Sequence, residues 1–245
     1  MARLTIFHTS DMHNKLTPDY AARLHDLKAA NPGSLMLDSG DAIWSGNVYW
    51  RLGGEPVLDL MNAVPYDAMC MGNREFHFWG IGIDSKTSRA DFPVLSANIR
   101  TVRDSRDAPG LGYVAFEREG RRIIVFGLSV PRVTERMLVK TISEYYFADP
   151  IEAAAELVPR LRPECDVLVA LTHIGIRIDR ELAEKVSGID LILGGHTHLL
   201  TEERVGDTCI VHHGSHVHYA GRVDLEIESG RVVSIHNELI PIAKA

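Results

Sequence analysis

The sequence contains few cysteines and no long hydrophobic segment. Its three cysteines, Cys70, Cys165 and Cys209, are far apart and lack the CxxC spacing of redox and zinc sites. We therefore expect reduced thiols in a reducing compartment rather than a disulfide framework. No apolar run approaches the roughly 18 residues that a membrane-spanning helix needs, and the first residues resemble a strand rather than a signal peptide. These features predict a cytoplasmic protein without a membrane partner.

Positive charge is scarce as well. The 26 Lys and Arg residues are outnumbered by 33 Asp and Glu residues, which gives a formal net charge of −7. A protein that grips duplex DNA through a broad basic face has the opposite balance, so the composition argues against duplex nucleic acid as a partner. The 245 residues are 45% hydrophobic and 24% charged, which is typical of a globular protein. From the length we expect one domain that spans residues 1–245.

Short aliphatic segments alternate with helical segments along much of the chain. Strands are expected at Leu4–Thr9, Ser34–Leu37, Ala68–Met71, Val94–Ala97, Tyr113–Glu117, Ile123–Leu128, Val167–Leu171, Leu191–Leu193, Ile210–His212, Val223–Ile227 and Val232–His236. Helices are expected at Pro18–Ala30, Glu55–Val64, Pro150–Arg162 and Asp179–Val186. This alternation predicts an α/β fold whose parallel strands are joined by crossover helices. Turn residues at Glu119-Gly120 and Ser229-Gly230 predict two antiparallel hairpins.

Histidine is abundant, with 12 residues, and several of them follow predicted strands. Five strand ends carry residue types that ligate metals, namely Asp11, His13, Asp41, Asn73, His173, His196 and His198. Because ligands bind at the carboxyl ends of parallel strands, we expect these side chains to converge. Imidazole and oxygen ligands without thiolates favour Mn, Fe, Zn or Co over Ca or Mg. A carboxylate such as Asp41, at a tight Gly-Asp turn, can bridge two cations about 3.5–4 Å apart.

These blocks carry a resemblance to a known family. DMH, GD, GN, TH and GHTH, in this order, resemble the calcineurin-like metallophosphoesterase superfamily. The segments GDAIWSGNVYWRLGGEPVLDLMNAVPYDAMCMGNREF, FPVLSANI and GSHVHYAGRVDLEIE are similar to the catalytic domain of the 5′-nucleotidase, UDP-sugar hydrolase and 2′,3′-cyclic-nucleotide phosphodiesterase family. The resemblance implies a four-layer α/β/β/α metallophosphoesterase sandwich. The family's nucleotidases carry a further C-terminal nucleoside-binding domain, and we expect this chain to lack it, with loose substrate choice unless a homodimer closes the site.

The resemblance also implies a ligand set and a mechanism. One metal ion would be held by Asp11, His13, Asp41 and His198. The second would be held by Asp41, Asn73, His173 and His196. A water or hydroxide between the two ions would attack phosphorus in line with the leaving group. The implied cofactors are two divalent ions, Mn²⁺ first, with Zn²⁺, Fe and Co²⁺ as alternatives.

The sequence departs from the family where GNREFH replaces GNHEFD. Arg74 stands at the position of the family's catalytic His, and it can stabilise negative charge but cannot donate a proton. His77 stands where the family has a supporting Asp. If the segment is helical, positions 74 and 77 are neighbours on one face, so we predict that Arg74 clamps the phosphate while His77 acts as the acid. The alternative is that His77 is a loop histidine without a catalytic role.

Other residues near these motifs have two interpretations each. His216 and His218 could contact the substrate phosphate, although solvated loop histidines are the favoured interpretation for the dense set His212, His213, His216 and His218. Aromatic residues could stack on a base or simply pack, namely Trp44, Tyr49, Trp50, Phe76, Phe78 and Trp79. His8 is expected to be structural. Asp38 either supports a ligating histidine or caps a turn.

The sequence thus predicts a dinuclear metal-dependent phosphoesterase of small molecules such as nucleotides. Without the family's His, diesters and activated esters are favoured, because a poor leaving group needs a proton donor. If His77 supplies the proton, nucleoside 5′-phosphates become substrates too. A non-catalytic metal-binding scaffold on the same fold is one alternative. A single-strand nuclease is another, and the net charge of −7 counts against it.

Overall fold

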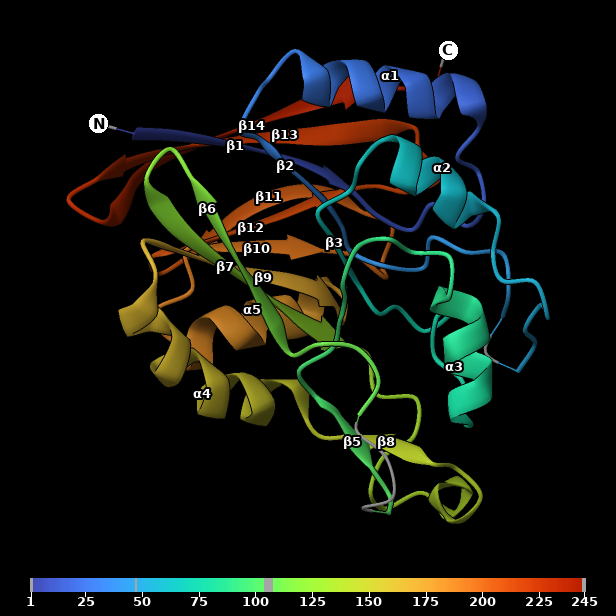
Figure 1. The fold of residues 1–245 in the computed structure, drawn as a ribbon. Helices are drawn as coiled ribbons and strands as arrows, with labels where there is room; N and C mark the ends of the chain where they lie inside the picture. The colour runs from blue at the N-terminus through green and yellow to red at the C-terminus, as the bar shows by residue number, and fades with distance from the viewer. Residues whose placement is uncertain (1, 47, 104–107, 244–245) are drawn as a thin grey trace.

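Two six-stranded sheets pack face to face and carry helices on their outer faces (Figure 1). The computed structural model describes residues 2–46, 48–103 and 108–243. Helices α1 (Pro18–Ala29) and α2 (Val57–Ala63) cover one sheet, and α4 (Pro150–Leu161) and α5 (Ile176–Lys185) cover the other. The predicted four-layer α/β/β/α sandwich is therefore confirmed.

The first sheet combines parallel strands with an antiparallel hairpin. Its order is β14-β13-β1-β2-β3-β4. The strands are β1 (Ala2–Thr9), β2 (Leu35–Asp38), β3 (Ala68–Cys70), β4 (Val94–Leu95), β13 (Tyr219–Glu228) and β14 (Arg231–Pro241). β1 to β4 run parallel, whereas β13 runs antiparallel to β1 and to β14. Ser229 and Gly230, both with positive φ, form the predicted turn between β13 and β14.

The second sheet has the order β11-β12-β10-β9-β7-β6. Its strands are β6 (Tyr113–Arg118), β7 (Arg121–Ser129), β9 (Val167–His173), β10 (Leu191–Gly194), β11 (Leu200–Val205) and β12 (Thr208–His213). β7, β9, β10 and β12 run parallel, and β6 and β11 are antiparallel strands at the edges. The second predicted hairpin turn, at Glu119 and Gly120, joins β6 to β7.

Local sequence signals explain where the longer helices begin. Thr17 caps α1 by accepting a hydrogen bond from the backbone N–H of Tyr20, and Pro18 follows it. Asp149 caps α4 in the same way, with Pro150 at the first position. α5 begins at Ile176, earlier than predicted, because Gly175 at φ 83° turns the chain directly out of β9. Its apolar face then packs on the second sheet through Ile176 and Leu182.

Several short elements lie outside the prediction. They are α3 (Gly80–Thr87), β5 (Ile99–Thr101), β8 (Tyr145–Phe147) and the 3₁₀ turns Leu138–Thr141 and Arg162–Glu164. β5 and β8 pair into a small separate sheet beyond the end of the sandwich (Figure 1). The edge strand β11 was also not predicted. Strands of three residues carry too little periodicity to be recognised, and α3 contains two glycines that weaken its helical signal.

An aliphatic core fills the space between the two sheets. Its members include Ile6, Leu37, Val125, Val169 and Val211, all buried. Because helices also cover the outer faces, the central strands are buried on both sides and read as continuous apolar runs. Cys70 and Cys209 are buried free thiols in this core, and Cys165 is a half-buried free thiol. No helix among the described residues is long and apolar enough to span a membrane.

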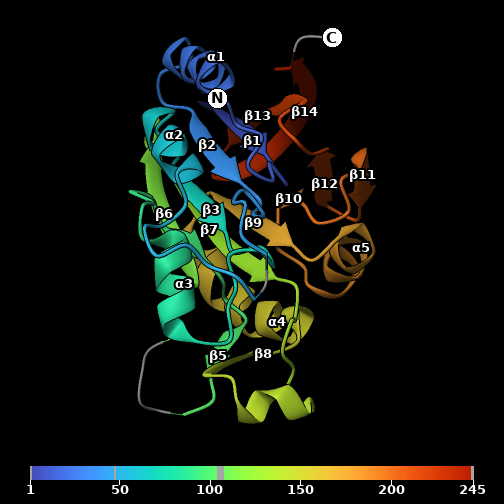
Figure 2. The same cartoon turned by 90° about the vertical axis from the view of Figure 1, so that its right-hand side faces the viewer.

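The parallel strands of both sheets end at the same side of the molecule. In Figure 2 this side faces the viewer, with the carboxyl ends of β2, β3, β9 and β10 in front. The loops that follow these strands therefore come together, as the rule for ligand sites in α/β sheets predicts.

Candidate metal centre

The loops after β1 and β2 are held side by side by backbone hydrogen bonds. The N–H of Asp11 donates to the carbonyl of Gly40 at 3.0 Å, and the N–H of His13 donates to the carbonyl of Asp41 at 2.9 Å. Gly40 is required here, because its φ is +93° and a Cβ would lie 2.6 Å from the N of Gly72. This close contact of loops brings the carboxylates of Asp11 and Asp41 to one place.

The second sheet contributes imidazoles to the same place. Nε2 of His173 lies 3.5 Å from Oδ1 of Asp41 and 4.0 Å from Oδ1 of Asp11. Nε2 of His198 lies 3.2 Å from Oδ1 of Asp11. Nε2 of His13 lies 3.7 Å from the same oxygen and 3.1 Å from Nε2 of His198. The ligand atoms thus form two overlapping groups, Asp11-His13-His198 and Asp11-Asp41-His173, each within 4.8 Å.

Two buried atoms of this cluster lack a hydrogen-bond partner among the described residues. They are Oδ1 of Asp11 and Nε2 of His173. Leaving a buried acceptor without a partner is costly, and such exceptions need a cause. A divalent cation between the imidazoles and the carboxylates would satisfy both atoms, and the donor set suits Mn, Fe, Zn or Co. The residues present therefore fit a metal ion.

The electrostatics of the cluster also favour a cation. Burial alone would raise the pKa of Asp11, but the His13 contact, the nearby His173 and the Ser10 hydroxyl hold it well below its usual range. Burial likewise acts against the ionised form of Asp41, and His173 outweighs it, so the pKa of Asp41 is lowered. Both carboxylates therefore stay ionised at neutral pH and can bind a metal without losing a proton.

The backbone is strained at most of the predicted ligands. Asp11, His13, Asp41, His196 and His198 all have positive φ, between 46° and 76°. Residues other than glycine seldom adopt this left-handed backbone conformation. It costs about 1–3 kcal/mol per residue where the fold imposes it. Strain of this kind concentrates at functional sites. Its presence at five predicted ligands supports the same assignment as their distances.

The orientation of His173 is fixed from behind the site. Its Nδ1 lies 2.7 Å from the backbone carbonyl of Ser39, to which it donates. Nε2 is therefore left without a proton when the ring is neutral, and it faces the carboxylates. Ligating histidines commonly donate their second nitrogen to a carbonyl or carboxylate in this way, which raises their basicity and fixes their tautomer.

His196 and Asn73 lie at the edge of the cluster. The backbone N–H of His196 donates to Oδ2 of Asp11 at 2.9 Å, and its ring centroid lies 5.0 Å from that of His173. Asn73 is half-buried in the turn after β3, next to Arg74, whose N–H donates to Oδ1 of Asp41 at 2.7 Å. Both residues are placed beside the second group of ligands, where the sequence predicts them to act.

Glu75 has an organising role that the sequence analysis did not assign. Its buried carboxylate accepts hydrogen bonds from the backbone N–H groups of Gly72, Asp41 and Ala42, at 2.9 to 3.0 Å. Burial and the nearby Asp41 raise the pKa of Glu75. The side chain thus ties the loop after β3 to the loop after β2. Its signal in the sequence was its position inside the GNREF motif.

Lys86 organises the same region from α3, and it too was missed. Its buried Nζ donates to the carbonyls of Gly46, Arg74 and Phe76, at 2.6 to 2.8 Å. Burial lowers the pKa of Lys86 to about 8. Three carbonyl partners hold the motif loops together, and no local sequence pattern reveals a contact between a helix and two distant loops.

Arg74 lies beside Asp41, as its predicted role requires. Its Nη1 donates to the carbonyl of Trp44 at 2.9 Å, and its Nε lies 3.9 Å from Oδ2 of Asp41. The side chain is 31% exposed, so a substrate can reach it. A fixed positive charge at the rim of the cluster suits an anionic ligand.

His77 does not share a helical face with Arg74. Residues 73–75 form a turn and α3 begins only at Gly80, so the premise of a helix over positions 74 and 77 is wrong. His77 is buried, its Nδ1 accepts from the N–H of Trp79 at 3.0 Å, and its ring packs edge-on against Trp50. Burial and the charge of Lys86 lower its pKa. These contacts match the alternative of a packed histidine, and catalysis by His77 stays a prediction.

The late histidines divide into buried and accessible residues. His212 and His213 are buried on β12, so interpreting them as solvated loop residues is wrong. Their alternating positions aim one ring at α5 and the other into the space between the sheets. His216 lies at the cluster, with its ring stacked 5.2 Å from that of His13 and edge-on to His198 at 5.5 Å. His218 is exposed next to His216.

Two further alternatives from the sequence are now decided. His8 is buried and structural, with hydrogen bonds to Ser39 and His213. Asp38 accepts from the N–H of Gly40 and the hydroxyl of Thr9, so it caps the turn rather than supporting a ligating histidine.

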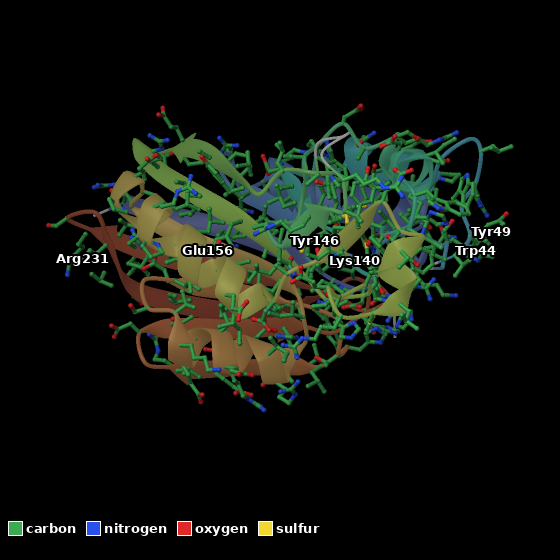
Figure 3. The ribbon with its side chains drawn as sticks, turned by 90° about the horizontal axis from the view of Figure 1, so that it is seen from below. Trp44, Tyr49, Lys140, Tyr146, Glu156 and Arg231 are labelled. Atoms are coloured by element: carbon green, nitrogen blue, oxygen red, sulfur yellow. The ribbon has the colours of Figure 1, made fainter. Side chains whose placement is uncertain are left out.

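The predicted aromatic cluster also divides. Phe76 is buried, and Phe78, Trp50 and Trp79 pack around it and His77. Trp44 and Tyr49 are about half exposed, at 48% and 53%, with ring centroids 5.4 Å apart. Figure 3 shows this pair at one end of the molecule, opposite to the end that carries Arg231. Trp79 is nearly as exposed, at 46%, but its ring lies next to those of Trp50 and His77.

Comparison with known proteins agrees with the geometry. Residues 4–200 match the calcineurin-like phosphoesterase family. The chain is 31% identical over 275 residues to the trifunctional nucleotide phosphoesterase protein YfkN of Bacillus subtilis, covering 94% of this chain and 18% of that protein. It is 29% identical to the 5′-nucleotidase of Bos taurus, covering 79% of this chain and 38% of the relative. The chain thus spans well under half the length of these curated relatives.

Solved structures show the same fold. The 5′-nucleotidase precursor from Thermus thermophilus superposes with a TM-score of 0.82 at 23% identity, covering 98% of this chain and 54% of the other. The calcineurin-like phosphoesterase YfkN from Bacillus subtilis gives a TM-score of 0.78, covering 98% and 91% of the two chains. The fold, the clustered ligands and the family match over residues 4–200 agree, and the protein belongs to the calcineurin-like phosphoesterase family.

Proposed function

We propose that the protein is a dinuclear metal-dependent phosphoesterase that hydrolyses small phosphate esters, nucleotides included. The observation that carries this proposal is Oδ1 of Asp11, which is buried and has no hydrogen-bond partner among the described residues. It lies within 4.0 Å of the Nε2 atoms of His13, His173 and His198. Asp11, His13, Asp41 and His198 would hold one ion. Asp41, Asn73, His173 and His196 would hold the second.

Bound divalent ions would supply a nucleophile from water near neutral pH and offset charge on the phosphoryl oxygens. The residues of the chain do the rest. Asp41 stays ionised beside both ligand groups, and His173 is held in the ligating tautomer by Ser39. Arg74 presents a permanent positive charge at the rim of the site, where it would bind a phosphoryl oxygen. His216, whose ring stacks on that of His13, and the exposed His218 next to it would also contact the substrate phosphate.

The substrate class follows from the relatives and from Arg74. Relatives are named 5′-nucleotidase and nucleotide phosphoesterase, and nucleotides are therefore the first substrates to test. Arg74 cannot donate a proton to a leaving alkoxide, so we propose that diesters and activated esters react faster than nucleoside monophosphates. A preference for Mn²⁺, a cytoplasmic location and a homodimer stay predictions.

The decisive experiment uses protein stripped of metal and reloaded with Mn²⁺. Hydrolysis of bis-p-nitrophenyl phosphate and of AMP is measured for the wild type, for Asp11→Asn and for Asp41→Asn. We expect both variants to lose at least about a hundredfold in rate, since each removes a charged metal ligand. Asp224→Asn is the matched control, because Asp224 is a buried aspartate that bonds Thr5 and Arg222 in the first sheet. It should keep the wild-type rate.

Three outcomes would contradict the proposal. Full turnover by Asp11→Asn would refute the site assignment. Two bound metal ions without hydrolysis of any ester would indicate the non-catalytic scaffold. Hydrolysis confined to single-stranded nucleic acid, with binding that weakens as salt rises, would indicate the nuclease.

A further inference from the structure

A buried pair of histidines joins the two sheets next to the metal centre. His8 lies near the end of β1 in the first sheet, and His213 ends β12 in the second. Their Nδ1 atoms are 2.6 Å apart, and the two residues are 0% and 2% exposed. The surrounding layer between the sheets is aliphatic, with Ile6 and Val211 among its members. Burying two imidazoles in such a layer costs free energy unless they are hydrogen-bonded to each other. Aliphatic side chains would fill the same space without that cost.

The backbone makes room for this pair. His8 lies opposite Gly221 in the register of β1 and β13. A Cβ on Gly221 would collide with the ring of His213, so only glycine leaves space for the imidazole between the sheets. Glycine inside a strand costs roughly 0.5–1 kcal/mol relative to alanine. The fold therefore accommodates the histidine pair at the expense of strand stability.

The pair belongs to a chain of hydrogen bonds that begins at Asn237. Nδ2 of Asn237 donates to Glu202 at 3.2 Å, so Oδ1 of Asn237 faces His213 and accepts from its Nε2 at 2.8 Å. Burial lowers the pKa of His213 to about 4, and its ring is neutral at neutral pH. The Nδ1 atoms of His213 and His8 are joined by one hydrogen bond. Nε2 of His8 lies 2.7 Å from the hydroxyl oxygen of Ser39, and that hydroxyl donates its proton to the carbonyl of Leu193 at 2.8 Å.

Ser39 connects this chain of hydrogen bonds to the metal ligands. Its carbonyl accepts the Nδ1–H of His173, and its own N–H donates to the carbonyl of Thr9. The side-chain oxygen of Ser39 is thus held by His8 and by the carbonyl of Leu193, and the backbone carbonyl of Ser39 in turn holds His173. The chain from Asn237 at the protein surface ends at a buried imidazole that faces Asp41.

The ligands themselves come from both sheets. Asp11 and Asp41 follow strands of the first sheet, whereas His173, His196 and His198 end or follow strands of the second. Their separation therefore depends on how the sheets are set against each other. Aliphatic contacts are non-directional and tolerate small shifts, whereas metal–ligand distances must be right to about 0.2 Å. A short hydrogen bond across the interface removes that freedom.

We propose that His8 and His213 are positioning residues of the metal centre: their hydrogen bond sets one sheet against the other and, through Ser39, orients His173. This inference rests on the metal centre of the proposed function. It assigns to the pair neither contact with a substrate nor proton transfer.

The first test replaces both members of the pair at once. In the double variant His8→Leu with His213→Leu, no buried imidazole is left without its partner, so the fold should survive with a melting temperature within a few degrees of wild type. We expect Mn²⁺ binding measured by calorimetry to weaken by about 10–100-fold for at least one ion. The visible absorption of Co²⁺-substituted protein should change as well, because it reports ligand geometry. Unchanged affinity and spectrum in the folded variant would overturn the inference.

A matched control separates positioning from packing. Val211→Ala removes inter-sheet packing two residues before His213 but leaves the hydrogen-bonded pair intact. It should lower the melting temperature while Mn²⁺ affinity and the Co²⁺ spectrum stay as in wild type. A loss of metal affinity in Val211→Ala as large as in the double variant would show that any loosening of the core has this effect, and would also overturn the inference.

A pair of single variants decides the matter if the double variant does not fold. The amide of His8→Asn can place a hydrogen-bonding atom near the position of Nδ1 and keep the bond to His213, whereas His8→Gln can reach only the position of Nε2. We expect His8→Asn to bind Mn²⁺ within about threefold of wild type and His8→Gln to bind at least about tenfold more weakly. Equal affinities would contradict positioning. If wild type itself binds no Mn²⁺, the proposed function fails instead.

Discussion

Removing the metal should leave a stability profile whose pH dependence is set by His173. Burial lowers the pKa of this imidazole, but Asp41 and Asp11 outweigh it and raise the pKa from 6.5 to about 10. In the metal-free protein a proton on His173 therefore supplies a positive charge beside Asp41 and Asp11, as the metal ion would. The folded state binds this proton more tightly than the unfolded chain does. Its contribution to stability is full below pH 6.5 and is lost as pH rises through 10.

Raising the pKa of His173 from 6.5 to about 10 stabilises the folded state by about 5 kcal/mol, of which about 3 kcal/mol would be lost by pH 9. Lys86 acts in the opposite direction, because burial lowers its pKa to about 8, so its contribution rises with pH above that value. A comparison with His173→Gln, which retains Lys86, removes that background.

The assay is urea unfolding in the presence of a chelator at several pH values between 6.5 and 9. Wild type should lose stability across this window relative to His173→Gln, and Mn²⁺ should abolish the difference because the metal displaces the proton. Proton release on Mn²⁺ binding, measured by calorimetry in buffers of different ionisation enthalpy, gives an independent value. Parallel profiles for metal-free wild type and His173→Gln would refute the reasoning.

Three further predictions test other parts of the site. Gly72→Ala should abolish Mn²⁺ binding, because the added Cβ would collide with the backbone N and Oδ1 of Asp41. Gly112→Ala is the control and should bind Mn²⁺ normally in the same titration, because its added Cβ would have its nearest neighbour at 3.8 Å. Trp44→Ala should lower kcat/KM for AMP about 5–100-fold if the half-exposed ring of Trp44 stacks on the base. The same variant should leave kcat/KM for ribose 5-phosphate unchanged, because that ester has a similar leaving group but no base. If His77 is only a packed histidine, as its contact with Trp50 indicates, His77→Ala should reduce stability and slow activated and unactivated esters equally. A selective loss of activity with AMP would instead support the acid role.

The clustering of the predicted ligands could be foreseen because the position of each depends on local chain geometry. Asp11, Asp41 and His173 sit where a strand ends, and a parallel sheet brings such ends to one edge whatever the details of packing. The hairpin turn at Glu119 and Gly120 is similarly local, since its residues adopt the positive φ values that the turn requires. Caps such as Thr17 and Asp149 fixed helix starts for the same reason.

His77 shows where local reasoning failed. Its spacing from Arg74 suggested a shared helical face, but the chain turns at residues 73–75 and sends the ring toward Trp50. Glu75 and Lys86 bind carbonyl and amide groups on loops that are distant in sequence, and no periodicity records such contacts. The prediction of solvated loop histidines at His212 and His213 was wrong for a related reason. β12 extends through His213, and because both faces of its sheet are covered, polar side chains on it are buried although their sequence resembles a loop.

Short segments of the sequence already carry the features that predict the site: strand-ending carboxylates, an amide and imidazoles in a fixed order, with glycines where loops must pass closely. Those features depend on residue type, turn geometry and strand direction, which are properties of short segments. Which histidines reach the site depends instead on the packing of the whole fold. His8 and His213 meet across two sheets, although 205 positions separate them in the sequence, because the packing of one sheet on the other is a long-range property that no local pattern encodes.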